Sequence, residues 1–112
     1  MAGPIGRAIG LVVVMLRPQP GVVGVGFWVV PSARTSGYAT SAVQLASSWA
    51  LGPAGFSRVE AWVEPDNVAS QRVLTSSGFE CEGRLRSFLS IGPTRSDAYV
   101  YARVAAMIDA AT

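Results

Sequence analysis

The chain begins with two runs of apolar residues rich in β-branched side chains, a composition that favours buried strands. They span Ile9 to Leu16 and Val22 to Val30, with turn residues at Pro18 to Gly21 between them. The spacing therefore predicts an antiparallel hairpin. Gly24 and Gly26 interrupt the second run, and we expect β-bulges there.

From Tyr38 to Leu51 the apolar residues follow helical spacing, and Gly52-Pro53 ends the segment. One apolar face results, made by Ala39, Ala42, Val43, Ala46, Trp49 and Ala50. Strict alternation then predicts a strand over Arg58 to Glu64.

A shorter helix is predicted over Val68 to Ser77, because Pro65 to Asn67 supplies a turn and an N-cap. Gly78 suits a left-handed C-terminal cap, with Phe79 as its hydrophobic contact. Two last strands, Glu80 to Leu89 and Asp97 to Val104, are joined by a turn through Gly92-Pro93.

The predicted order is strand, strand, helix, strand, helix, strand, strand. The strand–helix–strand crossover implies one parallel pair inside an otherwise antiparallel sheet. We therefore expect an α/β (α+β layered) fold, with helices on a mixed, mostly antiparallel sheet. With 112 residues, of which 50% are hydrophobic and 14% charged, the chain has the size and composition of one globular domain.

The residue inventory excludes several chemistries. All nine cationic side chains are arginines, and the chain has no histidine and no lysine. Ser/His/Asp catalysis, histidine-ligated metals and P-loop or Schiff-base lysines are therefore ruled out. Cys81 is the single cysteine, so we expect no metal site and no internal disulfide, which fits a reducing, cytoplasmic location.

The charge distribution and the N-terminus narrow the classes of partner. The arginines are scattered, so we expect no nucleic acid as partner and a small anionic ligand instead. Arg7 and the apolar run after it superficially resemble a signal peptide, but no small-x-small cleavage site follows. The run is also far shorter than the roughly 20 residues of a spanning helix, so we expect a strand and no membrane partner.

The segment from Arg34 to Thr40 lies directly before the first helix and suits a phosphate. Small residues allow close approach, the helix N-terminus offers free N–H groups, and Arg34 adds a positive charge. The alternative is an ordinary surface turn with a glycine. Gly24 and Gly26 do not complete a dinucleotide fingerprint, because position 29 is valine and no helix follows.

Several motifs resemble one family. Arg34-x-x-Gly37-x-Ala39 resembles the acetyl-CoA pyrophosphate loop of the Gcn5-related N-acetyltransferases (GNAT superfamily). The other motifs are similar to the RimJ/RimL-type branch, which acetylates the N-termini of ribosomal proteins. They are Phe27 to Pro31, Asn67-x-x-Ser70, Gly78-Phe79, Glu82-Gly83-x-Leu85-Arg86 and Asp97-Ala98-Tyr99.

This resemblance implies transfer of an acetyl group from acetyl-CoA, as co-substrate, to a primary amine, on a protein N-terminus or a small molecule. Val29 and Val30 would bind the pantetheine arm, and the strands Val22 to Val30 and Arg58 to Glu64 would splay to admit it. Asn67 would bind the pantetheine, and Ser70 would lie near the sulfur as the candidate catalytic residue. The pyrophosphate would be held by Arg34, Thr35, Ser36, Gly37, Tyr38, Ala39 and Thr40.

The sequence departs from the family pattern at the proton-transfer groups. Leu74 stands where many relatives have a tyrosine acid, which leaves Ser70 as the candidate, or as an ordinary residue of the first helical turn. The second strand lacks the carboxylate base that some relatives use. Glu60 and Glu64 lie on the next strand, where we expect solvated charges or ion-pair partners, with water to relay the proton.

Relatives begin with a strand, one or two helices and a further strand, and this chain starts at what resembles the family's third strand, so the resemblance implies that residues 1–112 form one N-terminally truncated N-acetyltransferase domain. Ile9 to Leu16 would then be an apolar edge. We favour a start misplaced upstream of Met1 over a degenerate fragment or a homodimer whose copies complete each other's sheet. The alternative function is a non-catalytic remnant that folds or dimerises and binds CoA weakly or not at all.

Overall fold

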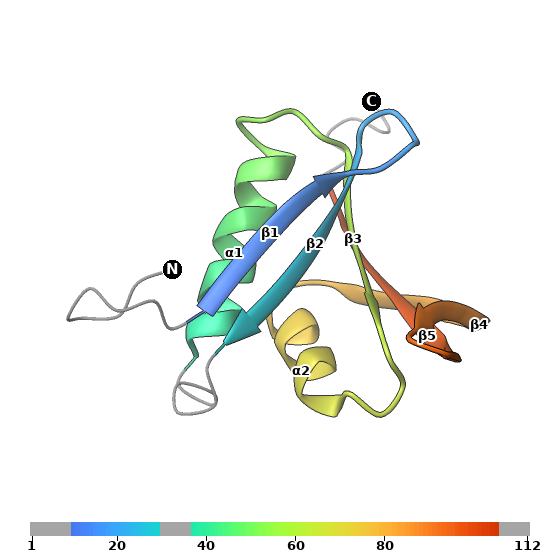
Figure 1. Ribbon diagram of the computed structural model, residues 1–112. Helices are drawn as coiled ribbons and strands as arrows, with labels where there is room; N and C mark the ends of the chain where they lie inside the picture. Colours follow the sequence, from blue (N-terminus) through green and yellow to red (C-terminus); the bar gives the residue numbers. More distant parts are fainter. Residues whose placement is uncertain (1–9, 30–36, 106–112) are drawn as a thin grey trace.

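The computed structural model describes residues 10–29 and 37–105, which form a five-stranded sheet and two helices (Figure 1). In chain order the elements are β1 (Gly10–Leu16), β2 (Val22–Val29), α1 (Tyr38–Leu51), β3 (Arg58–Val63), α2 (Val68–Ser76), β4 (Glu80–Ile91) and β5 (Thr94–Val104). Their order across the sheet is β1-β2-β3-β5-β4. The predicted order of elements and the fold class are confirmed.

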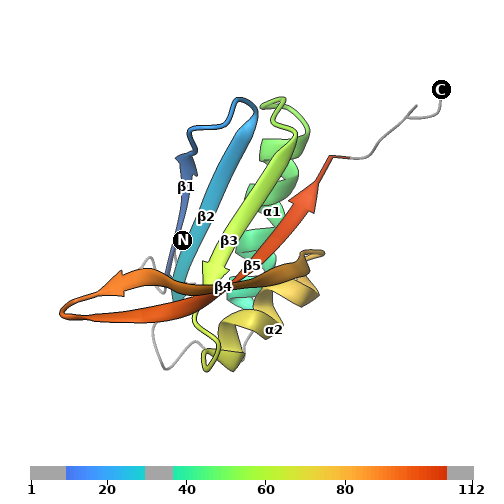
Figure 2. The ribbon, with the colours of Figure 1, turned by 90° about the vertical axis from the view of Figure 1, so that its right-hand side faces the viewer.

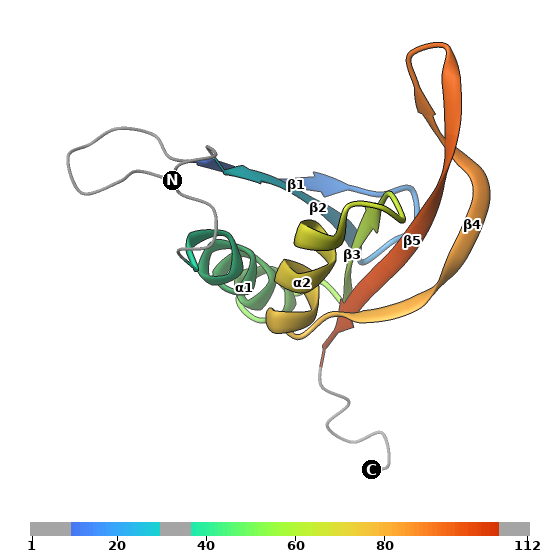
Figure 3. The ribbon, with the colours of Figure 1, turned by 90° about the horizontal axis from the view of Figure 1, so that it is seen from below.

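The strand pairing is mostly antiparallel. β1 pairs with β2, β3 with β5 and β4 with β5 in antiparallel fashion, whereas β2 and β3 run parallel, joined by the crossover through α1. Both helices lie on the same face of the sheet (Figure 3). Beyond the body, the β4–β5 hairpin projects to one side (Figure 2). The opposite face of β1, β2 and β3 carries no helix among the described residues.

The core lies between the helices and the sheet. Alternation along β3 buries Val59, Ala61 and Val63, as predicted, and leaves Trp62 on the other face. The buried hydrophobic cluster consists of Val23, Val25, Val43, Ala50, Val59, Ala61, Val63, Leu74, Phe79 and Tyr101.

The buried face of α1 differs from the prediction at two positions. Trp49, which the helical spacing assigns to the apolar face, is 53% exposed, whereas Ser47 is 1% exposed. Arg103 on β5 explains the buried serine, because its guanidinium donates hydrogen bonds to Ser47 Oγ at 2.7 Å and Ser48 Oγ at 3.1 Å. Which residues of α1 are buried is thus determined partly by a polar contact with Arg103 of β5.

The local signals around α2 are confirmed. Asn67 caps the helix, since its Oδ1 accepts a hydrogen bond from Ser70 N–H at 3.2 Å. The helix ends at Ser76, one residue before the predicted end. Gly78 has φ +94°, the left-handed conformation expected there, and Phe79 is buried beyond it. The hairpin strands extend further than predicted, to Ile91 and from Thr94.

The prediction of bulges at Gly24 and Gly26 is wrong. β1 and β2 pair without interruption from Gly10↔Val29 to Leu16↔Val23. At Gly24 the missing side chain has another reason: a Cβ there would lie 2.6 Å from Cζ and Nε of Arg17, whose guanidinium covers this position. Gly24 is therefore a site of close approach rather than an irregularity of the strand.

β1 forms one edge of the sheet and is apolar on both faces, as expected. Val12 packs against the core. The exposed apolar residues of this strand are Leu11, Val13, Val14, Met15 and Leu16. Neither described helix is both long and apolar enough to cross a membrane.

Candidate cofactor cleft

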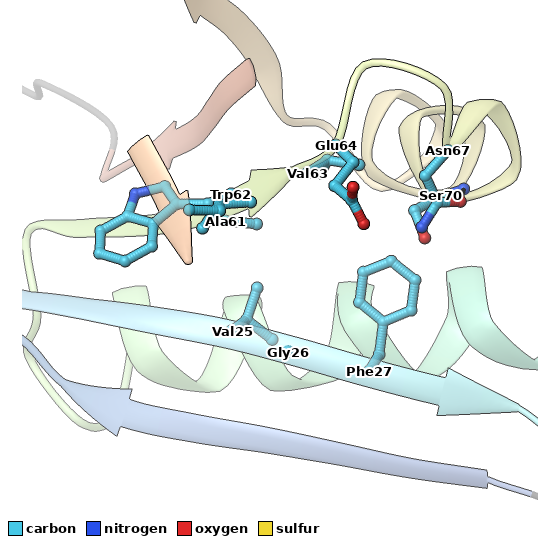
Figure 4. A pocket seen from close by; sticks show the side chains of 10 residues that line it. Val25, Gly26, Phe27, Ala61, Trp62, Val63, Glu64, Asn67 and Ser70 are labelled. Carbon is cyan, nitrogen blue, oxygen red and sulfur yellow. Dashed lines mark hydrogen bonds between the residues drawn. The ribbon is translucent and has the colours of Figure 1, made fainter. Parts of the chain in front are cut away.

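The parallel strands β2 and β3 separate part-way along their length. They pair only at Val22↔Arg58, Val23↔Val59 and Gly24↔Glu60. Beyond Gly24 a cleft of about 260 Å³ opens between them (Figure 4). It is lined by Val25, Gly26, Phe27, Ala61, Trp62, Val63, Glu64, Asn67, Ser70 and Leu89. The predicted splay of these two strands is confirmed.

The separation leaves backbone groups of β2 without a strand partner on the cleft side. Arg17 N–H donates to the Val22 carbonyl, so the even-numbered residues of β2 direct their backbone groups toward β1. The odd-numbered residues therefore direct theirs toward β3. The Val25 N–H still completes the last pair with β3, so the groups left for an extended ligand are the Val25 carbonyl and the backbone groups of Phe27 and Val29.

The N-terminus of α1 lies at the end of the molecule where β2 ends (Figure 1). Gly37 precedes it with φ +80°, and the first helical hydrogen bond is Ser41 N–H to the Gly37 carbonyl, at 3.0 Å. The N–H groups of Tyr38, Ala39 and Thr40 come before that bond and have no acceptor within the helix. They form a site suited to an anion. The predicted site residues Val30, Arg34, Thr35 and Ser36 lie outside the described residues.

Asn67 and Ser70 lie together on the cleft side of α2, one helical turn apart (Figure 4). The Asn67 side chain uses Oδ1 for the cap, which leaves its amide N–H groups for other partners. Ser70 uses its backbone N–H for the same bond, and its hydroxyl lines the cleft. Two of the predicted site residues are thus brought to one wall of one cleft.

Leu74 lies in the core and not in the cleft. It is 0% exposed and belongs to the buried cluster. The hydroxyl of Ser77, three residues further, is also committed: it donates to the Val73 carbonyl at 2.7 Å and contacts the Thr40 carbonyl at 3.2 Å. Among the described residues of α2, Ser70 is the hydroxyl that lines the cleft.

Glu60 is an ion-pair partner, as expected. Its carboxylate lies 3.6 Å from Arg17 Nε and 3.1 Å from Arg58 Nε. Arg58 also makes a two-pronged pair with Glu82, at 2.7 and 3.1 Å. The hydrogen bond from Arg58 lowers the pKa of Glu82 below its ordinary value, and the same bond raises the pKa of Arg58.

Three residues beside the cleft were not singled out from the sequence. Arg17 lies over the Trp62 ring, 3.9 Å from its centroid, and Phe88 meets the same ring edge-on at 4.9 Å. Their positions in the sequence are 17, 62 and 88, so no local spacing signals this stack. The stack covers the paired part of β2 and β3, on the face of the sheet that carries no described helix.

A second polar cluster holds the projecting hairpin. Ser87 has φ +53°, within an irregular stretch of β4 between Leu85 and Leu89. Its N–H donates to Asp97 at 2.7 Å, and Arg84 pairs with the same carboxylate at 2.9 Å. These two donors lower the pKa of Asp97.

In the part of the chain that the structure describes, no group of three His, Cys, Asp or Glu residues could hold a metal ion.

Residues 3–80 match the family model described as "Acetyltransferase (GNAT) domain". The chain belongs to the GNAT acetyltransferase family. This GNAT chain is 34% identical over 80 residues to "Uncharacterized N-acetyltransferase YoaA" from Bacillus subtilis, a match that covers 71% of the chain and 45% of YoaA. It is 39% identical over 61 residues to YjdG of the same organism, covering 54% of the chain and 36% of YjdG. The GNAT chain thus spans less than half the length of these relatives.

Solved structures agree with the fold. The acetyltransferase (GNAT family) from Bacillus anthracis has a TM-score of 0.84 and 24% identity, over 90% of this GNAT chain and 61% of that protein. RimJ of Mycobacterium smegmatis, in complex with CoA-disulfide, has a TM-score of 0.82 and 27% identity, over 90% of this chain and 49% of RimJ. The predicted membership of the GNAT superfamily is confirmed.

Proposed function

We propose that this chain is the cofactor-binding part of an N-acetyltransferase that transfers acetyl from acetyl-CoA to a primary amine. One observation carries the proposal: β2 and β3 part beside Asn67 and Ser70, leaving strand backbone groups directed into the cleft. An extended pantetheine arm needs such a row of donors and acceptors. Family membership supports the same reading.

The residues have separate parts in this proposal. The backbone groups of Val29 and Val30 hold the pantetheine arm and polarise the thioester carbonyl. Asn67 contacts the same arm through its amide. The pyrophosphate is bound by the segment Arg34 to Thr40, for which the free N–H groups at the start of α1 are suited.

The chemistry requires little beyond positioning. A neutral amine attacks the thioester carbon, and a fixed N–H donor stabilises the negative charge that develops on the carbonyl oxygen. Such a donor is worth about 10²–10³ in rate where it has been removed from other enzymes. Ser70 donates a proton toward the departing sulfur. The buried Leu74 cannot take that part, which strengthens the assignment to Ser70.

We assign residues 1–112 to one partial N-acetyltransferase domain of the RimJ/RimL type, acting in the cytoplasm. The motif Asn67-x-x-Ser70 supports this branch, as does the 27% identity with the mycobacterial RimJ structure. A protein N-terminus is then the acceptor class. The alternative acceptors are small amines, since the branch assignment rests on these few residues.

Calorimetric titration of the purified chain with acetyl-CoA tests cofactor binding. Micromolar affinity is expected, and Arg34→Glu weakens it by placing a negative charge against the pyrophosphate. Unchanged affinity in this variant contradicts the phosphate assignment. Absence of binding to a folded wild-type chain favours the alternative, a non-catalytic remnant.

Ser70→Ala tests the catalytic assignment. It should lower kcat about tenfold or more while the acetyl-CoA Kd stays unchanged, because the hydroxyl acts on the leaving group. Ser76→Ala is the matched control, since Ser76 is exposed on the same helix and does not line the cleft. Equal turnover in the two variants removes Ser70 from the mechanism.

A homodimer through the first strand also belongs to the proposal. The exposed apolar side chains of β1 support it, because an unpaired apolar edge offers both backbone hydrogen bonds and burial to a second strand. Light scattering on the calorimetry sample measures the mass. A monomer mass at the titration concentration contradicts this part of the proposal.

A further inference from the structure

Glu64 is the one ionisable side chain among the ten residues that line the cleft. It directly follows β3, and its side chain points into the space between Phe27 on one side and Ser70 on the other (Figure 4). From its place in the sequence we expect a solvated charge or an ion-pair partner here. In the structure Glu64 instead lines the wall of the cleft.

Three other acidic groups on this sheet are paired with arginines, whereas Glu80, at the start of β4, is exposed to solvent. Glu60, Glu82 and Asp97 each lie within 4.0 Å of an arginine nitrogen. None of the ion pairs among the described residues includes Glu64, which is partly buried. A carboxylate that lines a cleft and has no arginine partner among the described residues is available to a cationic ligand.

The backbone beneath Glu64 is held firmly. Its carbonyl accepts a hydrogen bond from Asn67 N–H at 3.0 Å and a longer one from Gln71 Nε2 at 3.4 Å. Gln71 also donates to the Pro65 carbonyl at 2.9 Å. The turn that carries Glu64 is thus fixed to the first turn of α2, the same turn that carries Ser70.

We propose that Glu64 binds the acceptor amine as its ammonium ion and accepts a proton from it. This inference rests on the proposed acetyl transfer. One N–H proton passes to the Glu64 carboxylate, and the freed lone pair forms the C–N bond to the thioester carbon. The C–S bond breaks with its electrons on sulfur, and the second proton lost from nitrogen ends on the CoA thiol. Glu64 then releases its proton to water.

The same carboxylate defines the acceptor class. Phe27 lies beside it (Figure 4), and its aromatic surface favours a cation. A free amino acid carries its own carboxylate two bonds from the amine, and that charge is repelled by Glu64. A peptide N-terminus or a plain alkylamine has no such charge. The structure therefore assigns primary amines without an adjacent acid group as substrates.

The test compares alaninamide with free alanine, which differ at the carboxyl group. Release of CoA thiol is measured for wild type, Glu64→Gln and Glu64→Asp at saturating acetyl-CoA. The control is Asp66→Asn, which removes one negative charge from an exposed position in the same turn, outside the cleft lining. Acetyl-CoA affinity is measured for each variant by calorimetry, and folding by thermal unfolding.

The expected result is a loss of about 10² in kcat/KM for alaninamide in Glu64→Gln, the lower range for a general base. The preference for alaninamide over alanine should fall about tenfold or more, while Glu64→Asp keeps most of that preference at a reduced rate. Acetyl-CoA affinity stays within twofold, and Asp66→Asn behaves as wild type.

Other outcomes separate the two levels of the proposal. Unchanged kcat/KM and an unchanged preference in a folded Glu64→Gln overturn the inference alone. Loss of acetyl-CoA affinity in that variant also overturns it, because Glu64 would then serve the cofactor. A wild type that binds acetyl-CoA but acetylates neither probe refutes the acceptor class. A wild type that binds no acetyl-CoA contradicts the proposed function itself, and the inference with it.

Discussion

Replacement of Gly24 by alanine should disturb the junction of β2 and β3 more than its position within a strand suggests. The new Cβ would lie 2.6 Å from Arg17 Cζ, so the guanidinium has to leave. It then gives up the Trp62 ring at 3.9 Å and Glu60 at 3.6 Å. The first contact is worth about 0.5–2 kcal/mol and the second about 0–1 kcal/mol.

Gly26→Ala is the matched control on the same strand and the same face. There the nearest side-chain atom to a new Cβ is Met15 Cε at 3.8 Å, an ordinary contact. Both substitutions reduce the conformational entropy of the unfolded chain equally, and this effect stabilises the folded state of each variant by about 0.4–1 kcal/mol. The two should therefore differ by about 1–2 kcal/mol in the free energy of unfolding, which corresponds to roughly 4–8 °C in Tm for each kcal/mol in a small domain.

Urea and thermal unfolding followed by circular dichroism measure this difference. A double-mutant cycle identifies its cause, because in an Arg17→Ala background the obstacle is gone and Gly24→Ala should match Gly26→Ala. Equal stabilities of the two single variants would refute the reasoning. So would a penalty at Gly24 that persists without Arg17.

The remaining predictions concern the α2 cap and the β4–β5 hairpin. Asn67→Ala should cost about 1 kcal/mol, whereas Asn67→Asp keeps the cap acceptor; both lose the amide N–H and weaken acetyl-CoA binding. Urea unfolding and calorimetry separate these effects, and wild-type affinity in Asn67→Asp would exclude the amide contact. Asp97 has a lowered pKa, so its stabilising contribution is complete above the ordinary value of 3.8 and is lost as the pH falls through the folded value. Thermal unfolding from about pH 5 to pH 2 should therefore decline less steeply in Asp97→Asn than in wild type, and identical slopes would contradict this.

The features predicted correctly depend on neighbours in the chain. The Asn67 cap and the left-handed Gly78 are settled within one or two turns of helix. The alternation of β3 likewise requires only that one face of the sheet be buried. Such signals can be recognised in the sequence without knowledge of the rest of the fold, and they allowed the order of the elements to be predicted.

The features that were missed depend on residues far away in the sequence. Ser47 is buried where Arg103 reaches it from β5, whereas Trp49 is exposed. Gly24 is explained by Arg17 across the hairpin and not by strand geometry. For the site, the sequence led to Asn67 and Ser70 through a motif, whereas the setting of Glu64 required the cleft to be seen.

The short pairing between β2 and β3 has a mechanical consequence. It divides the sheet into two parts, β1–β2 and β3–β5–β4, which are joined by three register pairs. On one face, α1 packs against both parts. Widening the cleft then strains these few hydrogen bonds, the contacts of Arg17 with Glu60 and Trp62, and the packing of α1, while each part of the sheet keeps its own strand pairing. The junction of β2 and β3 is thus the place where the sheet can open, and a ligand bound between these two strands would stiffen the junction as an intervening strand would.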